Sequence, residues 1–182
     1  MKMTTGLLLA LVIGAAGCSP ATEPAREEAA AVEAMPEQKA EAVDSGDAAA
    51  MAADPRLVVV HKNETCSCCH DWVEHLKKNG YRVLVRDVSN LGPIKERVGV
   101  PYGMGSCHTA EVGGYFLEGH VPAADIARLL EERPKAKGLT VPGMPVGSPG
   151  MEIEGMEAQP YDVHLVGSDG STSVYAHHGG GG

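Results

Sequence analysis

The chain has 182 residues, of which 24 are acidic and 15 are basic, so its formal net charge is −9 at pH 7. This acidic balance and the lack of a basic patch in the sequence argue against nucleic acid as a partner. Aromatic residues make up only 4% of the chain, which predicts a modest core. A bound metal ion would help such a domain to stay folded.

The first 18 residues are typical of a bacterial export signal. Residues 6–16 are apolar, and Gly17 and Cys18 follow them. A Cys directly after Ala-Gly resembles a lipobox, whose Cys becomes the lipidated first residue, although an ordinary secretory signal is the alternative. The apolar run is too short to span a bilayer, so we expect membrane attachment only through a lipid anchor on Cys18. Ser19 then indicates a periplasm-facing lipoprotein of the outer membrane.

Residues 19–56 are rich in Ala, Glu and Pro and contain no aromatic residue. Such a stretch buries too little apolar area to offset the entropy lost on ordering. We therefore predict a disordered acidic tether here, followed by one folded domain over residues 57–178.

The folded domain is expected to be α/β. A β-branched run at residues 57–61 predicts a buried strand. Residues 69–76 repeat apolar positions at helical spacing, and Gly80 ends that helix. With a second strand at residues 81–88, the unit implies parallel pairing through a right-handed crossover. The next predicted elements are a short helix at residues 94–98, strands at residues 107–112 and 114–118, and a helix that Pro122 opens and Pro134 ends.

The predicted order is β-α-β-α-β-β-α with a CxxC motif after the first strand, which is the thioredoxin-like pattern. We expect a central sheet with helices on both faces. Residues 139–156 add a Pro/Gly/Met-rich loop, in which prolines and glycines interrupt every helix or strand pattern. Residues 161–166 and 172–176 then predict a C-terminal β-hairpin.

Three cysteines occupy the run Cys66-Ser67-Cys68-Cys69, where the first strand should pass into a helix. Thiolates at a helix N-terminus are stabilised by the partial positive charge there, which raises their reactivity. The run indicates thiol redox chemistry with Cys66 and Cys69 as the catalytic pair, a thiophilic metal such as Cu(I), or both. A structural disulfide of an exported protein is the less specific interpretation.

Cys107 stands near the start of a strand that should begin opposite the dithiol. We expect it to face Cys66 and Cys69, so that four sulfurs gather in one place. A disulfide from Cys107 to Cys68 or Cys69 is the alternative.

Histidines and methionines add candidate ligands. Met thioethers select Cu(I), although Met is also a common filler of core gaps. Zinc is a further option, but a tetrahedral zinc site would use two separated ligand pairs, which three cysteines in four residues fit poorly. The candidate metal ligands are Cys66, Cys68, Cys69, Cys107, His70, His108, Met104, Met144 and Met151.

Three separated motifs, TCSCC, GMGSCHTAEVGGYFLEGHVP and GLTVPGMPVGSPGME, resemble the CopG-like family of exported copper-resistance proteins. The resemblance covers residues 57–176. It implies a thioredoxin-like fold, copper binding and a place in periplasmic copper tolerance. The family's motifs map onto Cys66, Cys68 and Cys69 and onto Cys107 and His108.

The sequence thus predicts a periplasmic copper-binding protein that holds one or several Cu(I) ions and is able to move copper between Cu(I) and Cu(II). Copper ions and other periplasmic copper-handling proteins are the expected partners. The alternative function is a dithiol-disulfide oxidoreductase acting on protein thiols, which needs two cysteines where a copper cluster uses all four. A disulfide-stapled partner-binding module is a third interpretation.

Overall fold

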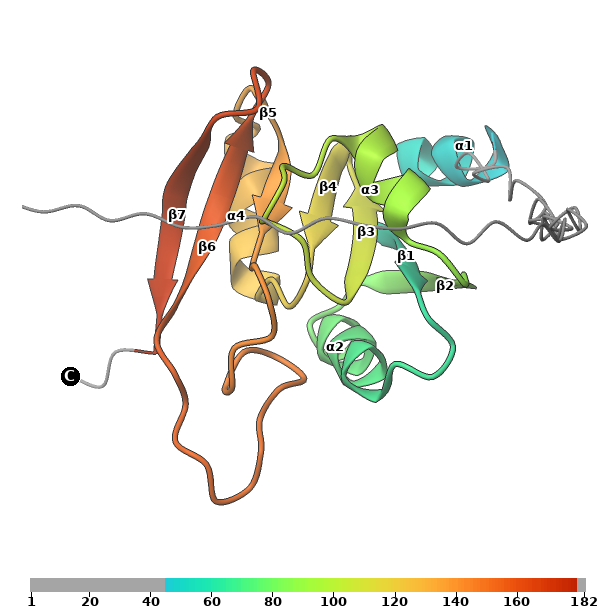
Figure 1. Ribbon diagram of the computed structural model, residues 1–182. Coiled ribbons are helices and arrows are strands. Elements are labelled where there is room, and N and C mark those ends of the chain that lie inside the picture. The colour runs from blue at the N-terminus through green and yellow to red at the C-terminus, as the bar shows by residue number, and fades with distance from the viewer. Residues whose placement is uncertain (1–44, 180–182) are drawn as a thin grey trace, which may run out of the picture. The chain divides into compact units, whose positions relative to one another are not determined.

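The computed structural model describes residues 45–179, so the predicted lipobox and most of the predicted tether lie outside the described residues. Within this range the chain forms a seven-stranded sheet and four helices (Figure 1). The elements are α1 Ser45–Ala53, β1 Leu57–Lys62, α2 Ser67–Lys78, β2 Arg82–Asp87, α3 Gly92–Val98, β3 His108–Val112, β4 Tyr115–Glu118, α4 Ala123–Glu132, β5 Ala136–Thr140, β6 Tyr161–Gly167 and β7 Thr172–His178.

The strands form one mixed sheet in the order β2-β1-β3-β4-β5-β6-β7. β1 is parallel to β2, and β4 is parallel to β5, while the other neighbouring pairs are antiparallel. The predicted β-α-β-α-β-β-α order runs from β1 to α4, and the predicted hairpin is β6 and β7. The α/β class predicted from the sequence is therefore confirmed.

Helices α2 and α4 share one face of the sheet and pack on its main core. Trp72 of α2 is fully buried, and its indole N–H donates a hydrogen bond of 2.9 Å to the carbonyl of Val121, just before α4. One turn later, His75 accepts a hydrogen bond of 3.1 Å from the backbone N–H of Ala123. Because this N–H belongs to the first turn of α4 and has no partner within the helix, His75 stabilises the start of α4 from a neighbouring helix.

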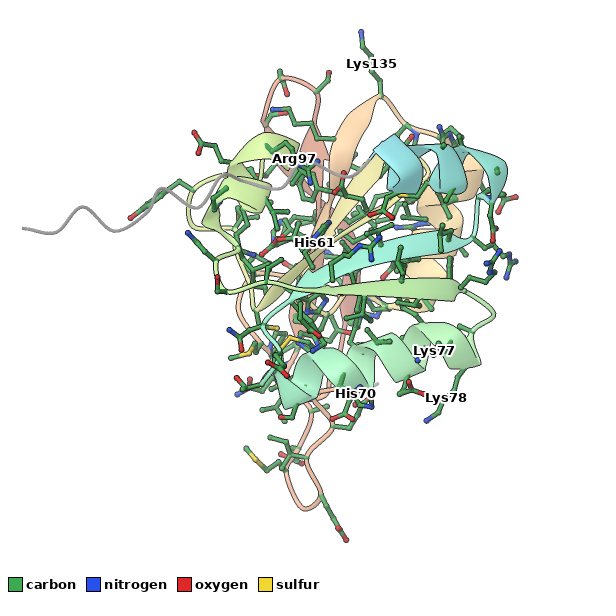
Figure 2. The ribbon with its side chains drawn as sticks, turned by 90° about the vertical axis from the view of Figure 1, so that its right-hand side faces the viewer. His61, His70, Lys77, Lys78, Arg97 and Lys135 are labelled. Atoms are coloured by element: carbon green, nitrogen blue, oxygen red, sulfur yellow. A yellow bond between two sulfur atoms is a disulfide. The ribbon has the colours of Figure 1, made fainter. Side chains whose placement is uncertain are left out.

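Helix α3 covers the other face, where the sheet carries charged side chains. Lys95 forms an ion pair with the buried Glu118 of β4, and Arg97 pairs with Glu111 of β3 at 2.7 Å. Figure 2 shows α1 and α2 on opposite sides of the β1–β2 edge. Strand β1 is buried along its whole length because helices cover it on both faces.

Helix α1 lies in the stretch that the sequence predicts as tether. Two ion pairs connect this part of the chain to β2: Asp47 to Arg86 at 2.7 Å and Asp54 to Arg82 at 3.0 Å. The ordered part of the chain therefore extends N-terminally of residue 57. Composition could not reveal this, because the arginine partners of the two aspartates come from a distant strand.

Strand β5 overlaps the segment that the sequence predicts as irregular. Its central residue, Gly138, lies against Phe116 of β4, and a Cβ atom at Gly138 would collide with the Phe116 carbonyl oxygen. Close approach of two backbones is a common reason for glycine within a strand. Residues 141–160, between β5 and β6, contain neither helix nor strand, as predicted for the Met-rich loop. Among the described residues, no helix is long and apolar enough to cross a bilayer.

We expect acidification to destabilise the metal-free protein in part through His75. Burial holds the pKa of His75 below its ordinary value, and Nε2 must be unprotonated to accept from Ala123. The unfolded chain therefore takes up this proton more readily, so the contribution is complete above the unfolded pKa of about 6.5 and is lost as the pH falls through the folded pKa. His75→Gln, which retains an acceptor, should flatten the pH dependence of the free energy of unfolding in urea. An unchanged pH dependence would contradict this role.

Candidate metal centre

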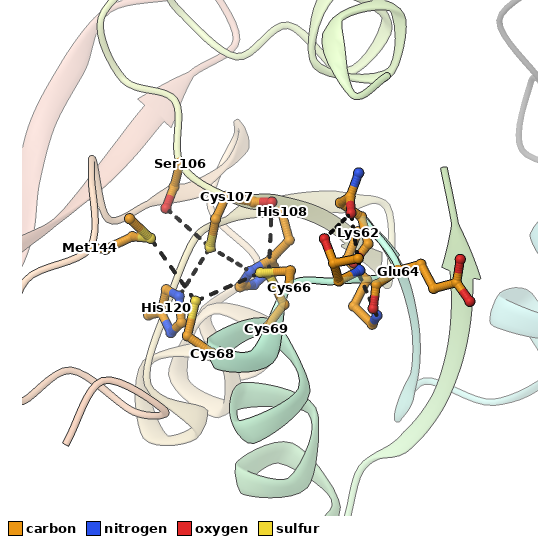
Figure 3. Close-up of a disulfide and its surroundings, with 12 residues drawn as sticks. Lys62, Glu64, Cys66, Cys68, Cys69, Ser106, Cys107, His108, His120 and Met144 are labelled. Carbon is orange, nitrogen blue, oxygen red and sulfur yellow. Dashed lines mark hydrogen bonds between the residues drawn. A yellow bond between two sulfur atoms is a disulfide. The ribbon is translucent and has the colours of Figure 1, made fainter. Parts of the chain in front are cut away.

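The first turn of α2 positions the three cysteines of the CSCC run. Cys66 is the N-cap residue of the helix, and no side chain caps the free backbone N–H groups there. Cys66 and Cys69 form a disulfide with their Cα atoms 5.4 Å apart, as Figure 3 shows. Cys68 is a free thiol whose sulfur lies 3.7 Å from that of Cys66. A disulfide and a third sulfur thus meet at the end of a helix where negative charge is stabilised.

Cys107, the second free thiol, directly precedes β3. Because β1 and β3 pair antiparallel, with Lys62 opposite His108, the end of β1 and the start of β3 lie at the same edge of the sheet. Cys66, Cys68, Cys69 and Cys107 consequently lie with all four sulfurs within 4.8 Å of one another. The structure therefore brings together the four sulfurs that the sequence predicts at one place.

Cys107 also contacts two histidine rings. Its sulfur lies 3.4 Å from Nδ1 of His108 and 3.1 Å from Nε2 of His120. These three donor atoms form a second group within 4.8 Å, and Cys107 is the member that the two groups share. Sequence reasoning did not select His120. The β3–β4 hairpin supplies it: Thr109 pairs with Glu118, so two residues further out Cys107 lies opposite His120.

The hydrogen bonds of His120 determine its tautomer. Nδ1 lies 2.7 Å from the carbonyl oxygen of Pro149, which only accepts, so Nδ1 carries the proton. Nε2 then keeps its lone pair and directs it at Cys107. Burial lowers the pKa of His120, which keeps the ring neutral near pH 7. This is the form in which imidazole binds metals.

His108 is fully buried between the sheet and α2. Its ring packs on Trp72 with the centroids 4.3 Å apart, and its Nε2 atom has no hydrogen-bond partner. Burial, followed by the neighbouring His120 and Lys95, lowers the pKa of His108 well below the ordinary value. The ring is therefore neutral. A buried polar atom without a partner is rare in folded proteins, and the ring faces Cys107 with its other nitrogen, Nδ1.

A buried carboxylate positions the backbone that carries Cys107. Glu118 accepts hydrogen bonds from the backbone N–H of Ser106 at 2.5 Å and from the hydroxyl of Thr109 at 2.7 Å, in addition to its ion pair with Lys95. Burial raises the pKa of Glu118, while Lys95 opposes this effect. Because Ser106 and Thr109 flank Cys107 and His108, Glu118 holds both residues from the opposite face of the sheet.

Part of the Met-rich loop lies against the cysteines. Met144 is half exposed, and its sulfur lies 4.0 Å from that of Cys68. Among the described residues, the predicted ligands His108 and Met144 therefore both contact a cysteine sulfur, whereas His70, Met104 and Met151 make no such contact. The side chain of His70 is exposed on α2. Met104 and Met151 form hydrogen bonds through their backbones, to Thr140 and Ser148.

Two solved structures are similar to this chain. The solved structure "Copper resistance protein copG- Form 2" has a TM-score of 0.64 and 47% sequence identity, and the match covers 67% of this chain and 97% of that one. "Copper resistance protein copG- Form 1" has a TM-score of 0.65 and 46% identity, with 70% and 100% covered. This chain belongs to the CopG-like family.

The family described as "Protein of unknown function, DUF411" matches residues 104–151. In this CopG-like protein, that segment contains Cys107, His120 and Met144, which are three of the residues that meet at the cysteine run. No curated protein matches the chain.

We expect Cys68 and Cys107, the two free thiols of the described residues, to react at very different rates in the disulfide-bonded protein. Burial and the neighbouring Cys68 raise the pKa of the Cys107 thiol to about 12, so little of the reactive thiolate is present near pH 7. Iodoacetamide should label Cys68 first, and the Cys107 rate should rise roughly tenfold per pH unit as its thiolate fraction grows. Peptide mapping by mass spectrometry at timed quenches measures both rates. Equal labelling of the two residues at neutral pH would contradict this account.

Proposed function

We propose that this protein acts in copper resistance by holding Cu(I) through Cys66, Cys68, Cys69 and Cys107. The observation that carries the proposal is the meeting of these four sulfurs within 4.8 Å, in a chain 47% identical to a copper resistance protein. Thiolate sulfur is a soft ligand that favours Cu(I) over harder divalent ions. The sheet and α2 hold the four sulfurs close together.

The donor set suits more than one ion. Cys107 belongs to both the four-sulfur group and the group with His108 and His120. A thiolate at that position is able to bridge two Cu(I) ions, with neutral imidazole on one side and sulfur on the other. The thioether of Met144 at Cys68 is a further soft donor.

The disulfide supplies a route between the two oxidation states of copper. When the Cys66–Cys69 pair closes from two thiolates, it gives up two electrons, which reduce two Cu(II) ions to two Cu(I) ions. Opening the pair again requires two electrons from a thiol reductant. With a thiol reductant the protein would thereby convert Cu(II) into Cu(I), and the reverse conversion would take the two electrons that open the disulfide from two Cu(I) ions, while Cys68 and Cys107 remain free thiols.

A second candidate function follows from the disulfide itself. We propose that β1 to α4 is a thioredoxin-like unit, and a CxxC disulfide at the N-terminus of its first helix is the arrangement of a dithiol oxidoreductase. Such an enzyme would act on protein thiols through Cys66, which is partly exposed, and would resolve through the buried Cys69. Copper binding is favoured because exchange has no use for Cys68, Cys107 and His120.

Replacing Cys107 separates the two functions. Cys107→Ser exchanges a soft thiolate for a hard hydroxyl and should lower Cu(I) stoichiometry or affinity as much as Cys66→Ser does. Anaerobic titration of the reduced protein with Cu(I), with thiol counting, measures this. Ser67→Ala, an exposed change within the same run, is the matched control and should bind as the wild type does. Unchanged copper binding by Cys107→Ser, with disulfide reduction intact, would favour the oxidoreductase.

We also propose that the protein faces the periplasm from the outer membrane, held by lipid on Cys18, and exchanges copper with other periplasmic copper-handling proteins. The apolar run and the Ala-Gly-Cys sequence support this location. Several acyl chains on one Cys would give stable attachment, whereas a single chain binds only marginally.

The mature N-terminus tests this location. We expect mass spectrometry of the protein expressed from its full sequence to show an N-terminal Cys18 that carries lipid, with the protein in the outer-membrane fraction. Cys18→Ala should release the protein or block its processing. A mature chain that begins at another residue, without lipid, would refute the lipoprotein assignment.

A further inference from the structure

Residues 141–150, which we call the strap, cross the cysteine site and are attached on both sides of it. On one side, the N–H of Gly143 donates to the carbonyl of Gly105 at 3.1 Å, and the Gly143 carbonyl accepts from the hydroxyl of Ser106. On the other side, the Pro149 carbonyl accepts from Nδ1 of His120 at 2.7 Å. Met144, between these attachments, contacts Cys68.

The Pro149 end of the strap lies directly against the backbone of α2. Gly150 has φ +82°, and a Cβ atom there would lie 2.6 Å from the backbone nitrogen of Trp72 and 2.9 Å from the carbonyl oxygen of Cys68. Only glycine permits this approach. Ser148 and Pro149 are buried, whereas residues 152–160 are exposed, so the Pro149 end of the strap is packed while the rest of the loop beyond it is in solvent.

This packing has a chemical consequence at His120. The Pro149 carbonyl has lone pairs only, so it selects the tautomer with the proton on Nδ1. In the other tautomer, two lone pairs would face each other at 2.7 Å, and the Nε2 proton would point at Cys107. A histidine that binds metal commonly donates its second N–H to a carbonyl, which orients the ring and raises the basicity of the ligating nitrogen.

We infer that the strap is a positioning element for the metal centre: Gly150 holds the Pro149 carbonyl in place, and that carbonyl fixes His120 with its Nε2 lone pair directed at Cys107. The inference rests on the proposed function, because Nε2 matters only if a soft metal ion binds there. Copper affinity then depends on a backbone contact from a loop that itself supplies no ligand at this position.

Gly150→Ala tests the inference without altering any candidate ligand. Its Cβ collides with the α2 backbone and should displace Pro149. Gly155→Ala is the matched control, because Gly155 lies in the same loop with φ +79° and a Cβ atom there would have no neighbour within 4 Å. Gly147→Ala is a second displacing variant, since its Cβ would collide with that of Ala158, away from the cysteines.

Two quantities are measured on each reduced variant: the tautomer of His120 and the affinity for Cu(I). Imidazole ¹⁵N NMR of the metal-free protein reports the tautomer of His120 and shows that the protein is folded. Anaerobic competition against a chromophoric Cu(I) chelator reports affinity. We expect Gly150→Ala and Gly147→Ala to lose the pure Nδ1–H tautomer and to bind Cu(I) roughly 10- to 100-fold more weakly, while Gly155→Ala matches the wild type in both.

The outcomes separate this inference from the proposed function. A folded Gly150→Ala protein with the wild-type tautomer and affinity would overturn the inference, and Gly147→Ala decides in the same way if Gly150→Ala does not fold. A changed tautomer with unchanged affinity would overturn the positioning role of the strap and leave the four-sulfur site standing. A wild-type protein that binds no Cu(I) would overturn the proposed function and the positioning role, while the NMR comparison would still show whether the strap holds His120.

Discussion

The antiparallel pairing of β1 with β3 is the constraint on which the site depends. It places the end of β1, which leads into the CSCC run, beside the start of β3, which follows Cys107. The same β3 pairs with β4 and thereby sets His120 opposite Cys107. Two ladders of backbone hydrogen bonds therefore bring together residues from three separate stretches of sequence.

The charged face of the sheet supports the sulfur-rich edge. Glu118 is fully buried and holds the backbone at Ser106 while it pairs with Lys95 of α3. A buried ion pair contributes little net stability, but the loss of one partner leaves an uncompensated buried charge and costs about 3–5 kcal/mol. Such a group is better suited to specifying one position of the chain than to stabilising the fold as a whole. Here the specified position is that of Cys107.

Much of this arrangement could be predicted from local sequence patterns, because β-branched runs, helical spacing and glycine turns act over a few residues. The strand that became β1 and helix α2 belong to this class, and the approach of Cys107 follows from the order of the predicted elements along the chain. His120 could have been predicted, since a hairpin symmetric about Gly113–Gly114 pairs residue 107 with residue 120. Helix α1 and strand β5 could not be predicted in this way, because they depend on partners distant in sequence. The Met-rich loop has no periodicity, so its sequence could not show that Met144 alone among the predicted methionines reaches a cysteine sulfur.

The two donor groups respond differently to oxidation. Closing the Cys66–Cys69 disulfide removes two thiolates from the four-sulfur group, but neither cysteine belongs to the group of Cys107, His108 and His120. Under the proposed function, the Cys66–Cys69 pair stores the electrons, whereas Cys107, His108 and His120 form a separate group that is able to keep copper bound. Copper held by Cys107 and the imidazoles would keep those ligands when the dithiol closes, and the strap, which holds His120 through the Pro149 carbonyl, would remain in place. Because the two groups differ in this way, oxidation of the dithiol would remove only part of the ligands of the metal centre.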